Sequence, residues 1–381
     1  MKYSTLVTFI RGQFNTDQFI PLHEPRFYGN EKKYLIDCID STFVSSVGKY
    51  VDDFEKRLAE YTGAKYAVAC VNGTAALHIS LIAVGVKQND IVITQPLSFI
   101  ATCNAIAYIG ASHLFVDVDF DTMGLSPEKL KIYLQEFAIK KEDGFSYHKI
   151  TDQKISACVP MHTYGHPCRI DELADICNYY NIVLIEDAAE SIGSYYKKKH
   201  TGTYGLIGTL SFNGNKIITS GGGGAIITND EVLAKKVKHL TTQAKVPHRW
   251  EFVHDDIGYN YRMPNINAAL MCAQLEQLNY FLENKRKLAL SYKDFFKEED
   301  IKFVEEPAHS KSNYWVCAIL LENRKKRDEF LQFTNDNGVM TRPTWILMNK
   351  LIMYKNSLHG NLDNAQALED RLVNIPSSVR I

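Results

Sequence analysis

Ile182-Val-Leu-Ile-Glu-Asp-Ala-Ala-Glu190 is the stretch of this sequence that decides the fold. It begins with a continuous apolar run and not with an alternating one, which is typical of a strand in a parallel sheet that is covered on both faces. The run ends on an acid, Asp187. Because open α/β sheets bind ligands at the carboxyl ends of their strands, this stretch predicts a buried sheet with an acid at its functional edge.

Apolar runs and segments of helical periodicity alternate on both sides of this strand. Such alternation predicts an α/β fold with a mostly parallel sheet. The predicted strands are 66–71, 91–94, 113–117, 155–160, 182–186, 209–212 and 225–228, and the predicted helices are 32–42, 50–62, 75–84, 101–108, 127–137 and 169–180.

The chain has 381 residues and is 45% apolar, enough for about two domains. A long helical region starts at Asn265 and runs to about residue 296, and we place a domain boundary within it, near Asn284. We therefore expect an irregular N-terminal arm (1–30), a large domain (31–284) and a small α+β domain (285–381). The predicted elements of the small domain are strands at 314–321 and 339–343 and helices at 325–337 and 365–372.

The overall charge and composition exclude several classes of function. Lys and Arg total 43 against 44 Asp and Glu, so no basic excess indicates binding to nucleic acid or to an anionic membrane. There is neither an apolar run of about 20 residues nor a signal-peptide cleavage pattern, which predicts a cytoplasmic protein. The eight scattered cysteines are expected to be reduced core residues, and the histidines lack metal-binding spacing, so no metal is predicted.

The segment Ser211-Phe-Asn-Gly-Asn-Lys-Ile-Ile-Thr-Ser-Gly-Gly-Gly-Gly-Ala225 places one lysine, Lys216, between a short strand and a glycine tract. Glycine-rich hairpins with one lysine are common, but the alcohol, the two asparagines and the glycine tract around Lys216 are poorly explained by a solvated surface charge. The alternative is an amine held against a bound carbonyl to form a Schiff base. Together with Asp187 at a second strand end, the lysine predicts a site for pyridoxal 5'-phosphate (PLP).

Asn72-Gly-Thr-Ala75 connects a predicted strand to a predicted helix. Amide groups at a helix N-terminus, a threonine hydroxyl and a glycine that permits close approach together favour an anion. Thr74 could instead only cap the helix. Taken with Lys216 and Asp187, the motif favours a phosphate site.

Three other positions have a structural and a functional interpretation. Asp187 is either an ordinary strand-end acid or the partner that keeps a pyridine nitrogen protonated. Phe99 is either core or the ring that stacks on the cofactor. In Gly258-Tyr-Asn-Tyr-Arg-Met-Pro264, Asn260 and Arg262 either lie in a helix entry or contact an anion or substrate across a dimer interface.

The motifs together resemble the fold-type I, PLP-dependent nucleotide-sugar aminotransferases of the DegT/DnrJ/EryC1/StrS family, over a range from about Pro21 to the C-terminus. The motifs that carry the resemblance are Asn72-Gly-Thr-Ala75, Pro96-Leu-Ser-Phe99, His162-Thr-Tyr-Gly165, Ile185-Glu-Asp-Ala-Ala-Glu190, Ser211-Phe-Asn-Gly-Asn-Lys216 and Gly258-Tyr-Asn-Tyr-Arg-Met263.

The resemblance implies a mostly parallel seven-stranded sheet in the large domain and a homodimer with shared active sites. It implies that Lys216 forms the Schiff base, that Asp187 pairs with the pyridine nitrogen and that Phe99 stacks on the ring. Its implied phosphate ligands are Gly73, Thr74, Ser211 and, from the partner subunit, Asn260. Many members have His or Gln near the phenolic oxygen of the cofactor where this chain has Glu190, which is expected to bond indirectly or to be protonated.

Three flanking segments are similar to one subgroup, namely Phe19-Ile-Pro-Leu-His-Glu-Pro-Arg26, Ser41-Thr-Phe-Val-Ser-Ser-Val-Gly-Lys-Tyr50 and Val339-Met-Thr-Arg-Pro-Thr-Trp345. That subgroup transfers an amino group from L-glutamate to UDP- or GDP-linked 4-keto-6-deoxy-N-acetylhexosamines, in pathways such as those to legionaminic acid and bacillosamine in bacterial surface glycans. The similarity implies that His23, Arg262, Arg342 and Trp345 contact the sugar nucleotide.

Two other functions fit the same scaffold. One is a PLP- or pyridoxamine-dependent sugar dehydratase, and the other is a non-catalytic regulatory protein. Related dehydratases typically have histidine at the position of Lys216, so the lysine argues against the first. The intact pair of Lys216 and Asp187 argues against the second.

Overall fold

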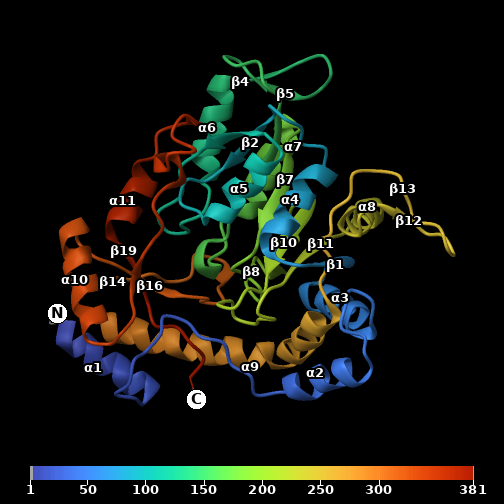
Figure 1. Ribbon diagram of the computed structural model, residues 1–381. Helices are drawn as coiled ribbons and strands as arrows, with labels where there is room; N and C mark the ends of the chain where they lie inside the picture. The colour runs from blue at the N-terminus through green and yellow to red at the C-terminus, as the bar shows by residue number, and fades with distance from the viewer. Residues whose placement is uncertain (1–2, 298, 300, 381) are drawn as a thin grey trace.

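The computed structural model describes residues 3–297, 299 and 301–380, so the outer ends of the predicted arm and small domain (1, 2 and 381) lie outside the described residues. Its centre is an eight-stranded sheet (Figure 1). The order is β1 (Tyr66–Cys70), β11 (Gly224–Thr228), β10 (Ile207–Ser211), β7 (Val183–Asp187), β6 (Ile155–Val159), β2 (Ile91–Thr94), β3 (Ser112–Phe115) and β18 (Leu358–His359). The first seven correspond to the seven predicted strands. The mostly parallel sheet is confirmed.

Strand β11 alone runs against the other strands of this sheet. It pairs antiparallel with both β1 and β10, whereas the remaining neighbours pair in parallel. The carboxyl ends of β1, β10, β7 and β2 therefore open on the same edge. The segments that follow these four strands contain all the predicted cofactor-binding motifs except the loop with Asn260.

Helices cover both faces of the sheet, as the continuous apolar runs predicted. Helices α4 (Gly73–Ala83), α5 (Ile100–Tyr108) and α8 (Glu231–Thr241) share one core with Val92. Helices α6 (Pro127–Phe137) and α7 (Ile170–Tyr180) share another core with Ile91 and Ile93. Successive residues of β2 thus point to opposite faces, and every residue of β2 and β6 is buried.

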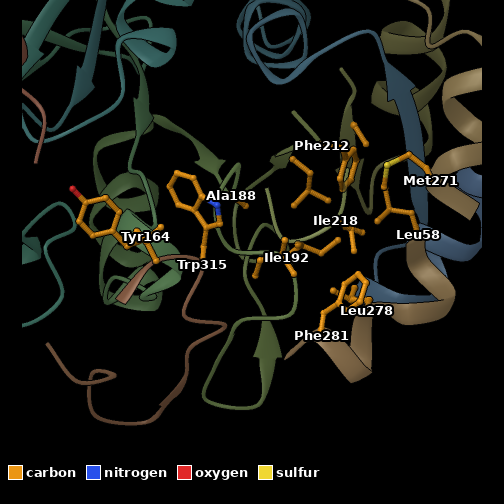
Figure 2. Close-up of a cluster of buried hydrophobic side chains, with 14 of the residues drawn as sticks. Leu58, Tyr164, Ala188, Ile192, Phe212, Ile218, Met271, Leu278, Phe281 and Trp315 are labelled. Atoms are coloured by element: carbon orange, nitrogen blue, oxygen red, sulfur yellow. The ribbon is translucent and has the colours of Figure 1, made fainter. Parts of the chain in front are cut away.

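Helix α9 (Asn265–Phe296) is 32 residues long and runs beneath the sheet (Figure 1). Its first half packs against α2 (Glu31–Asp40) and α3 (Lys49–Thr62). The core between them extends from Leu58 and Met271 to Tyr164 and Trp315 (Figure 2). This core contains Ile217 and Ile218, which are buried immediately after Lys216 and fix the backbone at the lysine.

A second, antiparallel sheet has four strands in the order β14 (Lys302–Phe303), β16 (Cys317–Leu320), β19 (Leu372–Ile375) and β17 (Arg342–Pro343). The other half of α9 packs on it together with α1 (Tyr3–Phe14) and α10 (Arg324–Asp336), and α11 (Asp363–Arg371) precedes β19. Because α9 is unbroken past Asn284, the division into an arm and two domains stays a prediction.

Three local predictions are wrong. The arm was expected to be irregular but contains α1, because Leu6, Val7 and Ile10 lie on one helical face and are buried in the core of the smaller sheet. The predicted helix 365–372 corresponds to α11, but the residues after it, which were not expected to form a strand, form the fully buried strand β19. The main sheet has an eighth strand, β18, of only two residues, too short to leave an apolar pattern.

The remaining elements are short and lie outside the two main sheets. Two hairpins are formed by β4 (Ala138–Lys140) with β5 (Ser146–His148) and by β12 (Lys245–Val246) with β13 (Val253–His254). A three-stranded sheet joins β15 (Ser310–Lys311), β8 (Tyr195–Tyr196) and β9 (Lys199–His200), and short helical turns are η1 (Thr163–Gly165) and η2 (Met348–Lys350). Among the helices of the described residues, none has the length and apolar character needed to cross a membrane.

Candidate active site

A cavity of about 290 Å³ lies at the sheet edge where β1, β2, β7 and β10 end. Eight residues predicted to bind cofactor or substrate line it together, which are Gly73, Thr74, Phe99, Asp187, Glu190, Ser211, Lys216 and Trp345. The other lining residues are Asn72, Leu77, Ala101, Thr102, Met161, Ala189, Asn213, Asn215 and Trp315. The strand-end argument and the family resemblance together therefore predicted about half of the residues that line the cavity.

Asp187 is the last residue of β7 and is 3% exposed. Its Oδ2 atom accepts a hydrogen bond of 2.6 Å from the hydroxyl of Thr102, and its Oδ1 atom accepts one of 3.1 Å from the amide of Ala189. Burial raises the pKa of Asp187, while these two hydrogen bonds and the charge of Lys216 act to lower it. A cation bound next to Asp187 would further favour its ionised form.

Lys216 lies between an acid and an aromatic ring. Its Nζ atom is 3.4 Å from Oε1 of Glu190 and 3.8 Å from the centre of the Trp315 ring. The indole N–H of Trp315 donates to the carbonyl oxygen of Asn215 at 2.7 Å, which ties the ring to the loop that carries the lysine. The amine is therefore held inside the cavity by contacts on two sides.

Glu190 is 3% exposed, and its Oε2 atom accepts a hydrogen bond from the amide of Tyr164 at 2.9 Å. Burial raises its pKa to about 7, although the nearby Lys216 and the Tyr164 amide act in the opposite direction. Tyr164 itself adopts a left-handed backbone conformation, with φ of 57°. A residue other than glycine in this conformation is strained, and such strain is concentrated at functional sites.

The first turn of α4 forms an anion cradle. The Asn72 side chain caps the helix by accepting from the Ala75 amide at 2.8 Å, so Asn72, and not Thr74, is the capping residue. In the described part of the chain, no hydrogen bond occupies the amides of Gly73 and Thr74. A Cβ atom on Gly73 would lie 2.9 Å from Cβ of Ser211, so only glycine fits between the helix and β10.

Aromatic side chains form the opposite wall of the cavity. Phe99 directly precedes α5 and is half exposed. Its ring packs edge to face with that of Trp345, with the ring centres 6.2 Å apart. The ring centres of Trp345 and Tyr164 are 5.0 Å apart. The Tyr164 hydroxyl donates to Thr344 at 2.7 Å and so fixes the end of this row. A flat, partly apolar ring could be bound against Phe99.

A buried carboxylate supports the cavity from behind. Glu186 accepts hydrogen bonds from the amides of Gly202 and Gly205, each at 2.7 Å, and its Oε2 atom is 3.0 Å from Nε2 of His162. Burial acts to raise the pKa of Glu186, but these bonds outweigh it and hold that pKa below its usual value. The contacts fix the end of β7 and therefore the position of the next residue, Asp187.

Four predicted site residues do not line the cavity of the single chain. His23 has two buried ring nitrogens without a partner in the described residues, and burial together with the charges of Lys285, Lys216 and Arg26 lowers its pKa well below the usual value. Asn260 is exposed and accepts from Arg262 at 3.3 Å, and Arg342 is exposed in β17. The binding roles of His23, Asn260, Arg262 and Arg342 stay predictions.

Sequence reasoning missed Thr102 and Trp315. Thr102 lies one helical turn after Phe99, so the spacing of the two residues could have indicated it. Trp315 is 100 positions from its bonding partner Asn215, and no local pattern connects these two residues.

Comparison with known proteins agrees with this geometry. Residues 26–381 match the sequence profile of the DegT/DnrJ/EryC1/StrS aminotransferase family. The chain belongs to this family. It is 38% identical to GDP-perosamine synthase of Escherichia coli O157:H7 over 363 residues, which are 94% of this chain and 93% of that protein.

Two further members of the DegT/DnrJ/EryC1/StrS family are informative. The UDP-4-amino-4,6-dideoxy-N-acetyl-beta-L-altrosamine transaminase of Campylobacter jejuni is 34% identical over 276 residues, 72% of this chain and 69% of that protein. The crystal structure of a family aminotransferase from Brucella abortus superposes with a TM-score of 0.82 and 26% identity, covering 91% of this chain and 90% of that one. The protein is a PLP-dependent sugar aminotransferase.

The chemistry of the residues that line the cavity fits PLP. The free amides of Gly73 and Thr74, with Ser211, form a cradle for a phosphate group. Asp187 is a buried acid for a ring cation, and Lys216 is the amine that would bond to the aldehyde. The chemistry that PLP supplies when bound is an electron sink for breaking bonds at the carbon next to the donor nitrogen.

Replacing Glu190 with glutamine is expected to change how stability depends on pH. In the cofactor-free protein, the pKa of Glu190 is about 7 when folded and near 4.5 when unfolded, so the folded state binds more protons between these values. The free energy of unfolding of the wild type should therefore fall as pH rises from 4.5 to 7. In Glu190→Gln this fall should be smaller by roughly 2 kcal/mol. Urea unfolding of the apoprotein at pH 5 and pH 8 measures this difference.

The matched control is Glu142→Gln, because Glu142 is an exposed glutamate. It should leave the pH dependence of the wild type unchanged. Parallel pH dependence in wild type and Glu190→Gln would show that burial of Glu190 does not perturb its protonation.

Proposed function

We propose that the protein transfers an amino group from L-glutamate to C4 of a UDP- or GDP-linked 4-keto-6-deoxy-N-acetylhexosamine. The reaction would take place in the cytoplasm and supply an amino sugar for a bacterial surface glycan or a nonulosonic acid such as legionaminic acid. The observation that carries the proposal is the placement of Lys216 and Asp187 in the wall of one cavity, beside an anion cradle.

The names of two relatives bear on the substrate and differ in the nucleotide. One relative is named for a UDP-linked 4-amino sugar with an N-acetyl group, and the more similar one for GDP-perosamine. The similarity of the flanking segments to enzymes of legionaminic acid and bacillosamine synthesis favours the N-acetylated substrate. We therefore retain both nucleotides in the proposal and test them separately.

In the proposed reaction, each residue of the cavity has a separate role. Lys216, once free, moves the proton between the reacting carbon atoms, which is a general acid–base role worth about 10²- to 10⁴-fold in rate. Asp187 stabilises positive charge on the ring, and Gly73, Thr74 and Ser211 bind the phosphate. Trp345 is one wall of the space in which the sugar would bind, and it helps to exclude water.

We also propose a homodimer in which each subunit contributes to the other's site. Asn260 is exposed and lies outside the cavity of its own chain, so a phosphate contact by this residue requires a second subunit. The projecting β12–β13 hairpin, with Trp250 at 69% and Phe252 at 78% exposure, lies near it in the sequence and supports such contact (Figure 1).

The test is the visible absorption of the PLP-loaded protein. Addition of L-glutamate should bleach the visible band, and the correct keto-sugar nucleotide should restore it. UDP- and GDP-linked 4-keto-6-deoxy-N-acetylhexosamines are compared with the same 4-keto sugars lacking the acetamido group. If only the sugars that lack the acetamido group restore the band, the proposed substrate is contradicted. If L-glutamate does not bleach the band, the proposed donor is contradicted.

A further inference from the structure

The Thr102 side chain holds the carboxylate that faces the cavity. Thr102 lies in the first turn of α5 and is 1% exposed, and its Oγ1 atom donates to Oδ2 of Asp187 at 2.6 Å. The bond crosses from the segment after β2 to the end of β7. It therefore connects two strand ends of the site that are 85 positions apart in the chain.

Each carboxylate oxygen of Asp187 has one hydrogen-bond donor in the described structure. The hydroxyl of Thr102 donates to Oδ2, and the amide of Ala189 donates to Oδ1 at the longer distance of 3.1 Å. A buried carboxylate needs such donors, because burial without them disfavours the charged form. Of these two hydrogen bonds, the one from Thr102 has a side-chain donor and the one from Ala189 has a backbone donor. A substitution can therefore remove only the bond from Thr102.

The Thr102 hydroxyl is oriented by a neighbour on the same turn. Ser98 donates to Oγ1 of Thr102 at 3.2 Å, which leaves the Thr102 hydrogen free to point at Asp187. Phe99, the residue expected to stack on the cofactor ring, lies between Ser98 and Thr102 in the sequence. One helical turn thus positions both the aromatic wall and the carboxylate.

We infer that Thr102 is a positioning residue of the aminotransferase site, whose hydroxyl fixes the Asp187 carboxylate at the cavity wall. The inference rests on the proposed function, in which Asp187 pairs with the ring nitrogen of PLP. Without this donor, Asp187 keeps a proton to higher pH and pairs less well with a ring cation. The other titratable groups that act on Asp187 are Lys216, His162, Glu190 and Cys103.

The experiment compares Thr102→Val, which keeps the shape but removes the hydroxyl, with Thr102→Ser, which keeps the hydroxyl. The first readout is the pH midpoint of the visible band of the PLP-loaded protein, and the second is kcat. Thr102→Val should shift the midpoint in the same direction as Asp187→Asn does. It should lower kcat about 10- to 100-fold, as expected for loss of a hydrogen bond to a charged group. Thr102→Ser should match the wild type in both.

The matched control is Thr94→Val. Thr94 is also buried, and its hydroxyl donates to the carbonyl oxygen of Val159 at 2.8 Å, away from the cavity lining. It should leave the midpoint unchanged. If Thr102→Val does not fold, Thr102→Ala, which adds no branched side chain, is measured in the same way.

Three results would overturn the inference. If Asp187→Asn shifts the midpoint and the hydroxyl-free variants do not, Thr102 has no positioning role although the proposed function stands. If Thr102→Ser changes the midpoint and kcat as much as Thr102→Val does, the shape of the side chain and not its hydroxyl is responsible. If Asp187→Asn leaves the midpoint at its wild-type value, the pairing of Asp187 with the ring is wrong, and the inference about Thr102 is overturned with it.

Discussion

Lys216→Ala is expected to lower the rate of multiple turnovers by at least about a thousandfold, because in the proposed mechanism Lys216 is both the amine that bonds to the cofactor and the proton carrier. Among the described residues that line the cavity, Lys216 is the only lysine, so no neighbouring amine can replace it. Steady-state assays with L-glutamate and the keto-sugar nucleotide measure the loss. The visible band of the lysine-bound cofactor should disappear at the same time.

The control for this variant is Lys325→Ala, which removes an exposed lysine from α10. Both variants should unfold at temperatures close to that of the wild type. Lys325 is exposed, and the contacts of the Lys216 amine with Glu190 and Trp315 lie at the cavity wall. Substantial multiple-turnover activity in Lys216→Ala would contradict the proposed mechanism.

Asp187→Asn is expected to retain the fold and lose most of the activity. Asparagine has nearly the same shape as aspartate and can still accept the hydrogen bond from Thr102, but it has no charge to balance a ring cation. Breaking a buried charge pair costs about 3–5 kcal/mol, which corresponds to about a 10²- to 10⁴-fold lower kcat. Steady-state kcat and thermal unfolding, measured on the same preparation, separate loss of function from loss of fold.

Asp175→Asn is the matched control, since Asp175 is an exposed aspartate of α7. It should leave kcat unchanged. Wild-type activity in Asp187→Asn would mean that the carboxylate does not pair with the ring. A large drop in unfolding temperature would instead assign Asp187 a structural role.

The main sheet could be predicted because its strands are apolar on both faces. Runs such as 182–186 predict strands without any knowledge of their neighbours, and parallel strands place the residues that follow them on one edge. Asp187, Lys216 and the Gly73-Thr74 pair were found in this way. Helix α1 also had a readable pattern, but its apolar face belongs to the smaller sheet, which the arm was not expected to reach.

The rest of the site depends on contacts between segments that are distant in the sequence. Trp315 enters the cavity from a segment far along the chain from Lys216, and nothing near it in the sequence indicates a site. Trp345 was expected in the site only from the family resemblance of its segment. The acid at position 190 was recognised as unusual, but its contact with Lys216 and its raised pKa depend on burial that only the folded chain provides. Local sequence patterns therefore predicted the residues at the sheet edge, whereas the residues of the opposite wall are brought to the cavity only by tertiary packing.

The late position of that wall in the chain has a consequence for protein synthesis. Strand β16, just after Trp315, pairs with β19, which is formed by Leu372–Ile375. During synthesis, Lys216 and Asp187 therefore emerge from the ribosome well before the strand that anchors the segment next to Trp315. We expect stable capture of the cofactor to require synthesis of the chain through β19, so that chains lacking Leu372–Ile375 should bind it poorly.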